Sequence, residues 1–544
     1  MLSYRKLAMR VLGRPLHTEG IDSPRPASQR AAAFVLTAAM LITLAAPAFA
    51  GTWYIENGDI TVKAGETKGT NKVSQGENPE VEDTNTVITN SDKDKASSNT
   101  VTIEAKDKDD KVEVTLKDVN IDTSSRSEAA VSVTGEGNTN IELDGDNALK
   151  SDIYSSGISS SGSLTISGGE NDSLTAQGGS GADGIYSSGS LTISGGTVTA
   201  NGGSGGGGDG GDGIWSSGGV TISGGSTVTA NGGDGKDDYG GDGIRSSDVT
   251  ISGGSTVTAN GGNGGNVSGD GIRSDGGVTI SGGTVKAAGG DSKDGYGGDG
   301  IRSGGGVTIF GNTVNAAGGN GGKVGGYGIC SFDRVAISGG TVEAAGGNGS
   351  TGGGSGIYSS VIDLSGSLEL TAKAGSPTGK ALLQNGRELD LDTIKDKLGP
   401  GAKVTATDAN GDSKQVSGPR PVEPEEPVIP EESSSSSDGG SATPSAPVSP
   451  LPGLTVTDKD GQRISYTSTQ SGNTLTVCVG RLTASLHVSL AALRQLRAEG
   501  IETITFQTIL CSTTLSVDEL LAMGGEDAEA VLTHRFTDSS LTVG

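Results

Sequence analysis

The sequence predicts an all-β protein organised around a right-handed parallel β-helix with coils of about 28 residues. Three observations predict this fold: a Gly-Ile dipeptide recurs at a nearly constant interval, each interval holds three short β-branched runs, and Ser-Ser-Gly or Gly-Gly corners separate the runs. Parallel strands joined by such turns are expected to coil right-handed. The recurring isoleucines are Ile158, Ile185, Ile214, Ile244, Ile272, Ile301, Ile329 and Ile357.

Alternation with period two within each run predicts which side chains face the interior. The first run contributes the Ile of Gly-Ile, the second contributes pairs such as Val220/Ile222, and the third contributes pairs such as Val228/Ala230. One unit cannot bury this face alone. Units stacked ~4.8 Å apart cover one another and align Ile on Ile and Val on Val.

Two other interpretations fit parts of this region. Its glycine and serine content is typical of a disordered low-complexity tract, but disorder does not require aliphatic residues that stay in phase through every unit. Segments such as GGSGADGIY suggest the calcium-binding nonapeptide β-roll, but that fold requires a much shorter period. The β-helix is therefore the preferred interpretation.

The N-terminus has the pattern of a secretory signal. A basic stretch precedes the uncharged apolar run Ala31–Ala50, which ends in small residues, so residues 1–50 are predicted to be a cleaved signal peptide. A membrane anchor is the alternative, but the run is barely long enough to span a bilayer, and its small-residue end fits a cleavage site better. The expected location is secreted or extracellular, either free or associated with the cell surface, with no membrane span in the mature protein.

The rest of the chain divides by composition. Residues 51–150 show strand patterns without glycine loops and are predicted to form an N-terminal cap and irregular first coils. The β-helix repeats occupy 151–375, a polar C-terminal cap 376–417, and a Pro/Ser/Glu-rich disordered linker 418–453. Residues 454–544 are predicted to form a small α/β domain of unknown role.

Two helices are expected in that last domain, and both have N-terminal capping signals. The first helix, Leu490–Glu499, is preceded by Ser489 and followed by Gly500. The second follows Ser516, whose spacing to Glu519 is that of a capping box.

Composition limits the partners and the chemistry. A formal net charge of −26 disfavours nucleic acid and anionic membranes and suits divalent cations. Three cysteines are too few for a disulfide framework, although Cys478 and Cys511 lie in one segment and can pair, which leaves Cys330 single.

The residue after each Gly-Ile faces outward in this scheme and forms a column along the coils. Aromatic rings stack on sugars, and arginine holds a carboxylate with two hydrogen bonds. This column therefore predicts a carbohydrate-binding face for a uronic-acid polymer, although ordinary surface variation is the simpler explanation. The candidate binding residues are Tyr186, Trp215, Arg245, Arg273 and Arg302.

A second column lies two residues before each Ile and consists of Asp183, Asp212, Asp242, Asp270 and Asp299. Carboxylates stacked at this spacing repel one another and need compensation. Bound calcium is one possible source of this compensation, and the loop acids Asp209, Asp237, Asp238 and Asp294 could complete its site. The other possible source is the arginine three residues later in the chain, as in Asp242 with Arg245. An Asp-Gly turn preference without any ion is the simplest explanation.

Catalysis is weakly indicated. Only His487 and His534 follow the signal segment, and neither stands in a recognisable nucleophile motif. Paired carboxylates for hydrolysis, or calcium with a basic residue for a lyase, are possible in so acidic a chain. The acids and arginines belong to the repeat, however, whereas an active site usually interrupts one. We therefore expect a protein that is not an enzyme.

The units GDGIRSSDVTISGGSTVTANGG and GDGIRSDGGVTISGGTVKAAGG, with the upstream NTNIELDGDNAL, resemble a family of secreted β-helical carbohydrate-binding domains from polysaccharide-degrading anaerobic bacteria. The resemblance covers about residues 101–375. It implies pectin-type acidic polysaccharide and calcium as ligands. The long glycine insertions and the loss of Asp from the last two units depart from the family pattern.

Together these features predict a secreted, monomeric, non-catalytic protein that binds acidic polysaccharide such as polygalacturonate with the help of calcium. A structural or adhesive surface protein is the first alternative, and a β-helix polysaccharide lyase is the second.

Overall fold

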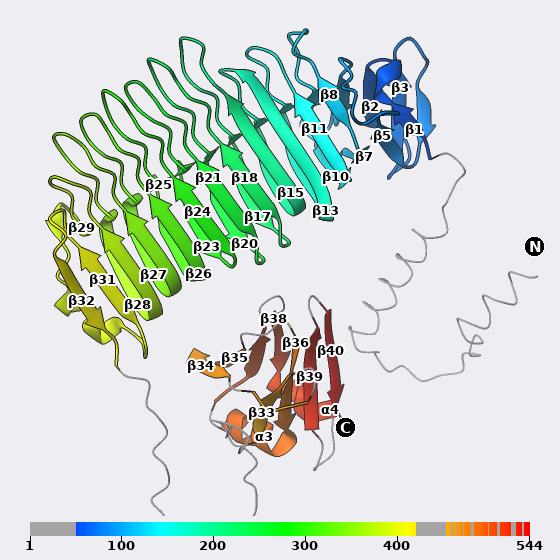
Figure 1. Cartoon of the computed structure of the whole chain (residues 1–544). Coiled ribbons are helices and arrows are strands. Elements are labelled where there is room, and N and C mark those ends of the chain that lie inside the picture. The colour runs from blue at the N-terminus through cyan, green and yellow to red at the C-terminus, as the bar shows by residue number, and fades with distance from the viewer. Residues whose placement is uncertain are drawn as a thin grey trace, which may run out of the picture. The chain divides into compact units, whose positions relative to one another are not determined.

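The computed structural model confirms the parallel β-solenoid, with about 13 turns of roughly 28 residues (Figure 1). The structure describes residues 50–419 and, with short gaps, residues 453–543. The predicted signal peptide and nearly all of the predicted linker lie outside these residues.

The first strand of each repeat begins at the Ile of Gly-Ile. Each pairs in parallel with its counterpart one coil away, so that Ile244 lies between Ile214 and Ile272. These strands are β12 (Ile158–Ser160), β14 (Ile185–Ser187), β16 (Ile214–Ser216), β19 (Ile244–Ser246), β22 (Ile272–Ser274) and β25 (Ile301–Ser303), followed by the starts of β27 (Ile329–Ala345) and β28 (Ile357–Lys373).

The second and third runs also form parallel ladders. In some coils they are separate strands, and in others they join into one long strand that bends at the corner. The separate strands are β17 (Gly219–Ser223), β18 (Thr227–Asn231), β20 (Val249–Ser252), β21 (Thr256–Asn260), β23 (Val278–Ser281) and β24 (Thr284–Ala288); the joined ones are β13 (Ser163–Ser180), β15 (Ser190–Gly203) and β26 (Val307–Ala317).

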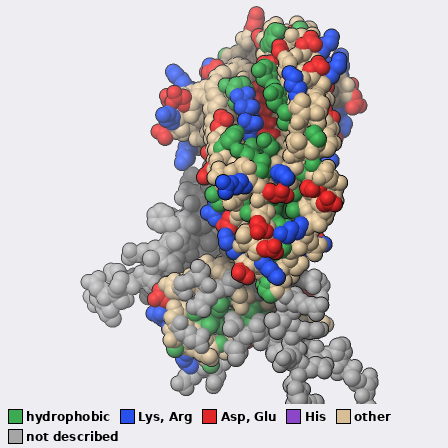
Figure 2. All heavy atoms as spheres, turned by 90° about the vertical axis from the view of Figure 1, so that its left-hand side faces the viewer, with side chains coloured by type: hydrophobic (Ala, Val, Ile, Leu, Met, Phe, Trp, Pro, Cys, Tyr) green, Lys and Arg blue, Asp and Glu red, His purple; other side chains and the backbone are tan. Residues whose placement is uncertain are grey.

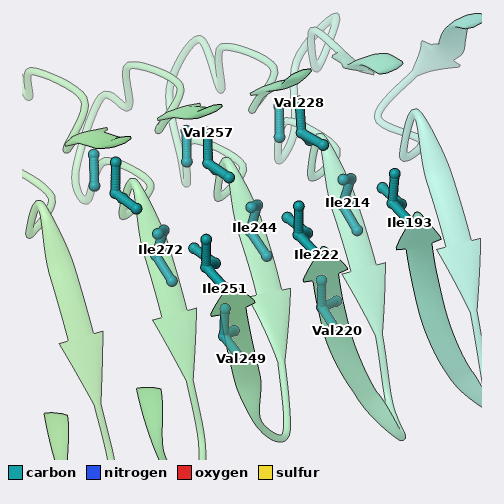
Figure 3. Close-up of a cluster of buried hydrophobic side chains, with 14 of the residues drawn as sticks. Ile193, Ile214, Val220, Ile222, Val228, Ile244, Val249, Ile251, Val257 and Ile272 are labelled. Atoms are coloured by element: carbon teal, nitrogen blue, oxygen red, sulfur yellow. The ribbon is translucent and has the colours of Figure 1, made fainter. Parts of the chain in front are cut away.

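The core consists of the aliphatic columns that the alternation predicts. In Figure 3 the Ile of each first strand stacks on the next, beside columns from the other two strands. Ile244, Ile251 and Val257 are fully buried, and burying such a side chain stabilises the fold by about 1.5–3 kcal/mol. Because neighbouring coils provide the burial, the core extends along the whole solenoid.

Glycine-rich loops connect the third strand to the next Gly-Ile and project from one edge of the coils (Figure 1). They are ordered by backbone hydrogen bonds that zigzag between two glycine columns. Gly298 N donates to Gly290 O at 3.0 Å, and Gly319 N donates to Gly298 O at 2.8 Å. A Cβ atom on Gly298 would lie 1.9 Å from Gly269 O. Only glycine allows this backbone packing, which accounts for the composition of the loops.

Residues 51–150 form further coils in register with the repeats, so Ile60, Val101, Val131 and Ile158 align. Antiparallel strands β2, β3 and β4 lie at the open end. The elements are β1 (Thr52–Tyr54), η1 (Ile55–Asn57), β2 (Ile60–Ala64), β3 (Asn71–Gln75), β4 (Val81–Asp83), β5 (Thr86–Thr89), β6 (Val101–Glu104), β7 (Lys111–Lys117), β8 (Asn120–Asp122), β9 (Val131–Thr134), β10 (Asn138–Asp144) and β11 (Asp146–Lys150).

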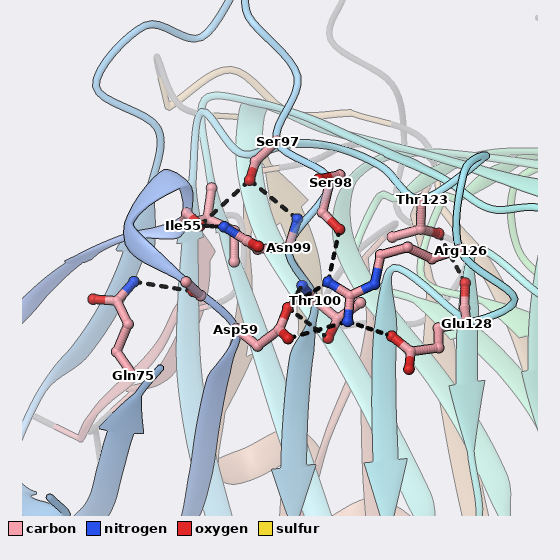
Figure 4. Close-up of polar contacts among 11 residues, drawn as sticks. Ile55, Asp59, Gln75, Ser97, Ser98, Asn99, Thr100, Thr123, Arg126 and Glu128 are labelled. Atoms are coloured by element: carbon pink, nitrogen blue, oxygen red, sulfur yellow. Dashed lines mark hydrogen bonds and ion pairs between the residues drawn. The ribbon is translucent and has the colours of Figure 1, made fainter. Parts of the chain in front are cut away.

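A polar network ties these first coils together (Figure 4). Arg126 donates to both carboxylate oxygens of Asp59, at 2.8 and 3.1 Å, and also pairs with Glu128. Asp59 accepts in addition the backbone N–H of Thr100 at 2.7 Å. Charged side chains from two coils and a backbone N–H from the coil between them therefore meet at one point and hold the end of the solenoid in register.

At the other end of the solenoid, a short 3-10 helix lies in residues 376–417, the segment for which a polar cap was predicted. Leu391 and Ile394 are buried there. The elements are β29 (Leu382–Gln384), β30 (Arg387–Glu388), η2 (Leu391–Lys397), β31 (Lys403–Thr407) and β32 (Ser413–Ser417).

The C-terminal module contains two four-stranded sheets and two helices with their own core around Phe506. Both predicted helices are present. Ser489 Oγ accepts from Ala492 N, and Gly500 follows the first helix with φ +90°. The elements are β33 (Leu454–Thr457), β34 (Thr467–Ser471), β35 (Thr474–Cys478), β36 (Thr483–Ser489), α3 (Leu490–Ala498), β37 (Thr503–Gln507), β38 (Ser512–Ser516), α4 (Val517–Met523), β39 (Glu529–Arg535) and β40 (Asp538–Val543).

Within the described ranges, no helix is long and apolar enough to cross a membrane.

Candidate functional site: a groove along the solenoid

A groove runs between the first strands and the glycine loops. It contains two adjoining cavities of about 270 and 380 Å³, which share Tyr239, Val267 and Arg273 in their lining. Figure 2 shows a face of the solenoid on which a row of basic side chains runs beside a recessed row of acidic ones, bordered by hydrophobic side chains. Both predicted columns contribute to this groove.

The aromatic–arginine column (Tyr186, Trp215, Arg245, Arg273 and Arg302) stacks one residue per coil, as predicted. Tyr186 and Trp215 meet edge to face at 5.2 Å, and the Arg245 guanidinium lies 5.0 Å from the Trp215 ring centre. The side chains of the three arginines are each 40% exposed. Tyr186 contacts Trp215 but does not line either cavity.

Beyond Arg302 the column continues with Cys330, whose predicted exposure is wrong. The alternation predicts that Cys330 faces outward, but it is only 1% exposed. Arg302 and Tyr358 flank it in the neighbouring coils, and their larger side chains can cover so small a residue. Burial raises the pKa of the Cys330 thiol, and the nearby Asp299 raises it further. This thiol is therefore protonated and unreactive at neutral pH.

The Asp column forms a ladder of hydrogen bonds with the backbone. From Asp212 onward, the N–H of each Asp donates to Oδ1 of the Asp one coil earlier; Asp242 N lies 2.6 Å from Asp212 Oδ1, and Asp270 N lies 2.6 Å from Asp242 Oδ1. At the far end, Tyr327 N donates to Asp299 Oδ1 at 2.7 Å. Each carboxylate therefore joins two coils.

The second carboxylate oxygen faces the arginines. Arg245 Nη1 lies 3.9 Å from Asp212 Oδ2, and Arg273 Nη1 lies 3.9 Å from Asp242 Oδ2. Each of these two arginines therefore reaches back to the preceding coil, so Arg245 forms its ion pair with Asp212 and not with the predicted Asp242. Its charge nevertheless lowers the pKa of Asp242, as expected for an arginine that offsets the repulsion. Arg302 alone pairs with the Asp three residues before it, at 3.4 Å from Asp299 Oδ2.

Burial and mutual repulsion perturb these carboxyls. Burial first, and then the charge of the neighbouring Asp, raise the pKa of Asp183, Asp212, Asp242 and Asp270 to about 7. Burial raises the pKa of Asp299 to about 6. The column is therefore only partly ionised at neutral pH.

The calcium prediction remains a prediction. In residues 50–419 and the described parts of 453–543, no three Asp, Glu, His or Cys side chains are grouped to hold a metal ion. Asp209 lines the groove and accepts from Tyr239 N at 3.2 Å, whereas Asp237, Asp238 and Asp294 are exposed in the loops. Backbone hydrogen bonds, arginines and partial protonation already offset part of the repulsion between the Asp residues.

Sequence reasoning missed the opposite side of the groove, the loop wall, which consists of Tyr239, Val267, Tyr296 and Val324. These residues pair by parallel bridges from loop to loop. Tyr239 and Tyr296 are 54% and 53% exposed. A signal was available, because every wall residue stands three positions before the Asp column or its replacement Tyr327.

The histidines of the C-terminal module make cross-strand contacts. His487 lies 3.1 Å from the Thr457 hydroxyl and 3.4 Å from the Glu529 carboxylate, on adjacent strands. Such pairs are common on sheet faces. Cys478 lies in β35 with a free thiol, which does not bear out the suggested disulfide; its proposed partner Cys511 falls outside the described residues.

The chain matches no family model, no curated protein and no solved structure. The β-helix that the family resemblance implied is confirmed by the fold. These comparisons give no support for carbohydrate binding.

Proposed function

We propose that the chain is an exported, non-catalytic protein that binds acidic polysaccharide such as polygalacturonate along this groove. The observation that carries the proposal is the row of three half-exposed arginines between aromatic side chains in a continuous depression. Guanidinium groups recognise carboxylates, and aromatic faces pack on sugar rings.

The length of the groove favours a polymer. Four successive coils line the groove with one column residue each, from Trp215 to Arg302. Three spacings of ~4.8 Å amount to about 14 Å. An extended chain can follow such a path, whereas a small molecule would occupy only a part of it.

The arginines keep donors for a ligand although acids lie beneath them. At 3.9 Å, the contacts of Arg245 and Arg273 with the Asp column are longer than hydrogen bonds. A ligand carboxylate at hydrogen-bond distance therefore adds interactions that the free protein does not satisfy.

The test is the triple variant Arg245→Ala, Arg273→Ala, Arg302→Ala. We expect its affinity for polygalacturonate, measured by isothermal titration calorimetry, to fall about 100-fold, since each lost contact to a charged group is worth about 1 kcal/mol or more. The matched control removes three exposed positive charges elsewhere, with Lys93→Ala, Lys106→Ala and Lys286→Ala. An unchanged isotherm for a folded triple arginine variant would disprove the proposal.

Calcium is tested in the same titration. If calcium assists binding, EDTA lowers the affinity of the wild type and added calcium restores it. Equal affinity with EDTA and with added calcium would show that calcium does not take part in binding. That result would not affect the proposed arginine contacts.

A lyase or hydrolase is the second candidate, because carboxyls with a pKa near 7 inside a cleft are typical of acid–base catalysts. Against it, Oδ1 of these carboxyls is already bound to the backbone in five successive coils. Incubation with polygalacturonate and detection of unsaturated or shortened products distinguishes an enzyme from a binder. If the protein neither binds nor cleaves any polysaccharide in a glycan panel, a structural or adhesive role is favoured.

A further inference from the structure

The loop wall alternates in a way that the aromatic–arginine column does not. From one coil to the next it reads Tyr239, Val267, Tyr296 and Val324. Aromatic rings therefore occur on every second coil, about 9.6 Å apart, whereas the arginines follow on every coil, ~4.8 Å apart.

Each wall tyrosine shares its coil with an arginine across the groove. Tyr239 leads into the strand that holds Arg245, and Tyr296 leads into the strand that holds Arg302. The lining of the 270 Å³ cavity includes Tyr239 and Arg245, and the lining of the 380 Å³ cavity includes Tyr296 and Arg302 together with Tyr239. The coil between them presents Val267 and Arg273, which line both cavities. The groove thus contains two similar halves, two coils apart.

We propose that these halves are two equivalent sugar subsites, each with a wall tyrosine and an arginine, and that they recognise a 1,4-linked uronic-acid chain in an extended, two-fold ribbon. The inference rests on the proposed function and specifies the form of its ligand. In a two-fold ribbon, alternate rings present the same face and place their carboxylates on the same side. One ring per coil then brings every second ring to a tyrosine and its carboxylate to an arginine.

The geometry sets a minimum ligand length. Rings one and three occupy the two subsites while ring two crosses the coil of Val267. A trigalacturonide is therefore the shortest oligomer that reaches both tyrosines, and a digalacturonide reaches one.

The experiment is calorimetric titration of the full mature chain with digalacturonide, trigalacturonide and tetragalacturonide. We expect affinity to rise at least about tenfold from the dimer to the trimer and little further to the tetramer. Tyr239→Ala and Tyr296→Ala should each weaken trimer binding about tenfold. Each tyrosine substitution should weaken digalacturonide binding about twofold or less, because the dimer can still bind at the other subsite.

One control separates this pattern from a general loss of exposed aromatic surface. Phe310→Ala removes an aromatic ring with similar exposure (58%) that lines neither cavity, and it should leave trimer affinity within about twofold. More than half of each tyrosine is exposed, so folding is expected to survive, and circular dichroism checks it.

The outcomes distinguish the two proposals. If the arginine triple variant loses binding while the tyrosine variants bind the trimer normally, the subsites are wrong and the binding function stands. Equal tenfold losses for Phe310→Ala and the tyrosine variants would also overturn the two subsites. If the wild type binds no galacturonide of any length, both proposals fail.

Discussion

The Asp column shows how one residue type serves fold and site together. Asp270 accepts the backbone N–H of Asp299 through Oδ1 and contributes to the lining of the groove. Exposed loop residues repeat the same bond outside the groove: Asn320 N donates to Asp291 Oδ1 at 2.6 Å, and Asp291 N donates to Asn263 Oδ1 at 2.9 Å. An Asn side chain can therefore accept the backbone N–H of the next coil as well as an Asp side chain can. An Asp→Asn substitution thus removes the charge and keeps the hydrogen bond.

The raised pKa values predict a pH-dependent stability. The folded chain holds protons on the Asp column up to about pH 7, whereas an unfolded Asp releases them near 3.8. The folded state binds more protons in this window, so its stability falls as pH rises from about 4 to 7. We expect the Tm in EDTA to be about 5 °C higher at pH 5 than at pH 8.

Asp270→Asn should flatten that profile by raising the Tm at pH 8, because the amide keeps the acceptor and removes a buried charge. Asp291→Asn makes the same change at an exposed position and should leave the profile as it is. A wild-type Tm that rises from pH 5 to pH 8 would contradict the raised pKa values of the Asp column.

At the scale of elements, the glycine loops are the least conventional part of the molecule. Their backbones pack against one another without side chains between them, and a Cβ at most of these positions would meet a carbonyl oxygen of the adjacent loop. Stacked loops also fix Tyr239 and Tyr296 opposite the arginines. The loops therefore form the second side of the groove because they contain so much glycine.

Gly298→Ala tests this packing. The new methyl would lie 1.9 Å from Gly269 O and must displace a loop, so we expect a loss of about 3 kcal/mol in unfolding free energy and faster hydrogen exchange in the adjacent loops. Gly207→Ala is the matched control, because no atom lies within 4 Å of the position that its methyl group would occupy. Its stability should stay within about 0.5 kcal/mol of wild type. Similar losses in both variants would show that the loops do not pack in this way.

At the scale of the whole solenoid, stability is a sum over coils and their interfaces. Each coil contacts its neighbours through three parallel ladders. The end coils differ: antiparallel strands and the Arg126 network close one end, and the η2 helix closes the other. Interior coils are therefore interchangeable, whereas the ends are not.

Deletion of residues 272–300 removes one interior coil and joins Gly271 to Ile301. Because Ile244 then stacks on Ile301 as it does on Ile272, we expect a folded solenoid with unchanged circular dichroism per residue. The groove loses Arg273 and Tyr296, so trigalacturonide affinity should fall about tenfold or more. Deletion of residues 272–285, about half a coil, breaks the register and should prevent folding. Equal folding of both deletions would argue against the coil as the unit of structure.

The solenoid, its period, the inward columns such as Ile244 and Val257, and the one-per-coil stacking of Arg245, Arg273 and Arg302 can all be predicted from the amino-acid sequence. These features follow from local alternation and a constant repeat, both of which are visible along one chain. Three relations required the folded structure: Arg245 reaches Asp212, Cys330 is buried, and Tyr239 and Tyr296 line the same groove as the arginines. Those relations depend on side-chain reach between coils and on how the glycine loops pack, and neither is encoded in the spacing of one repeat.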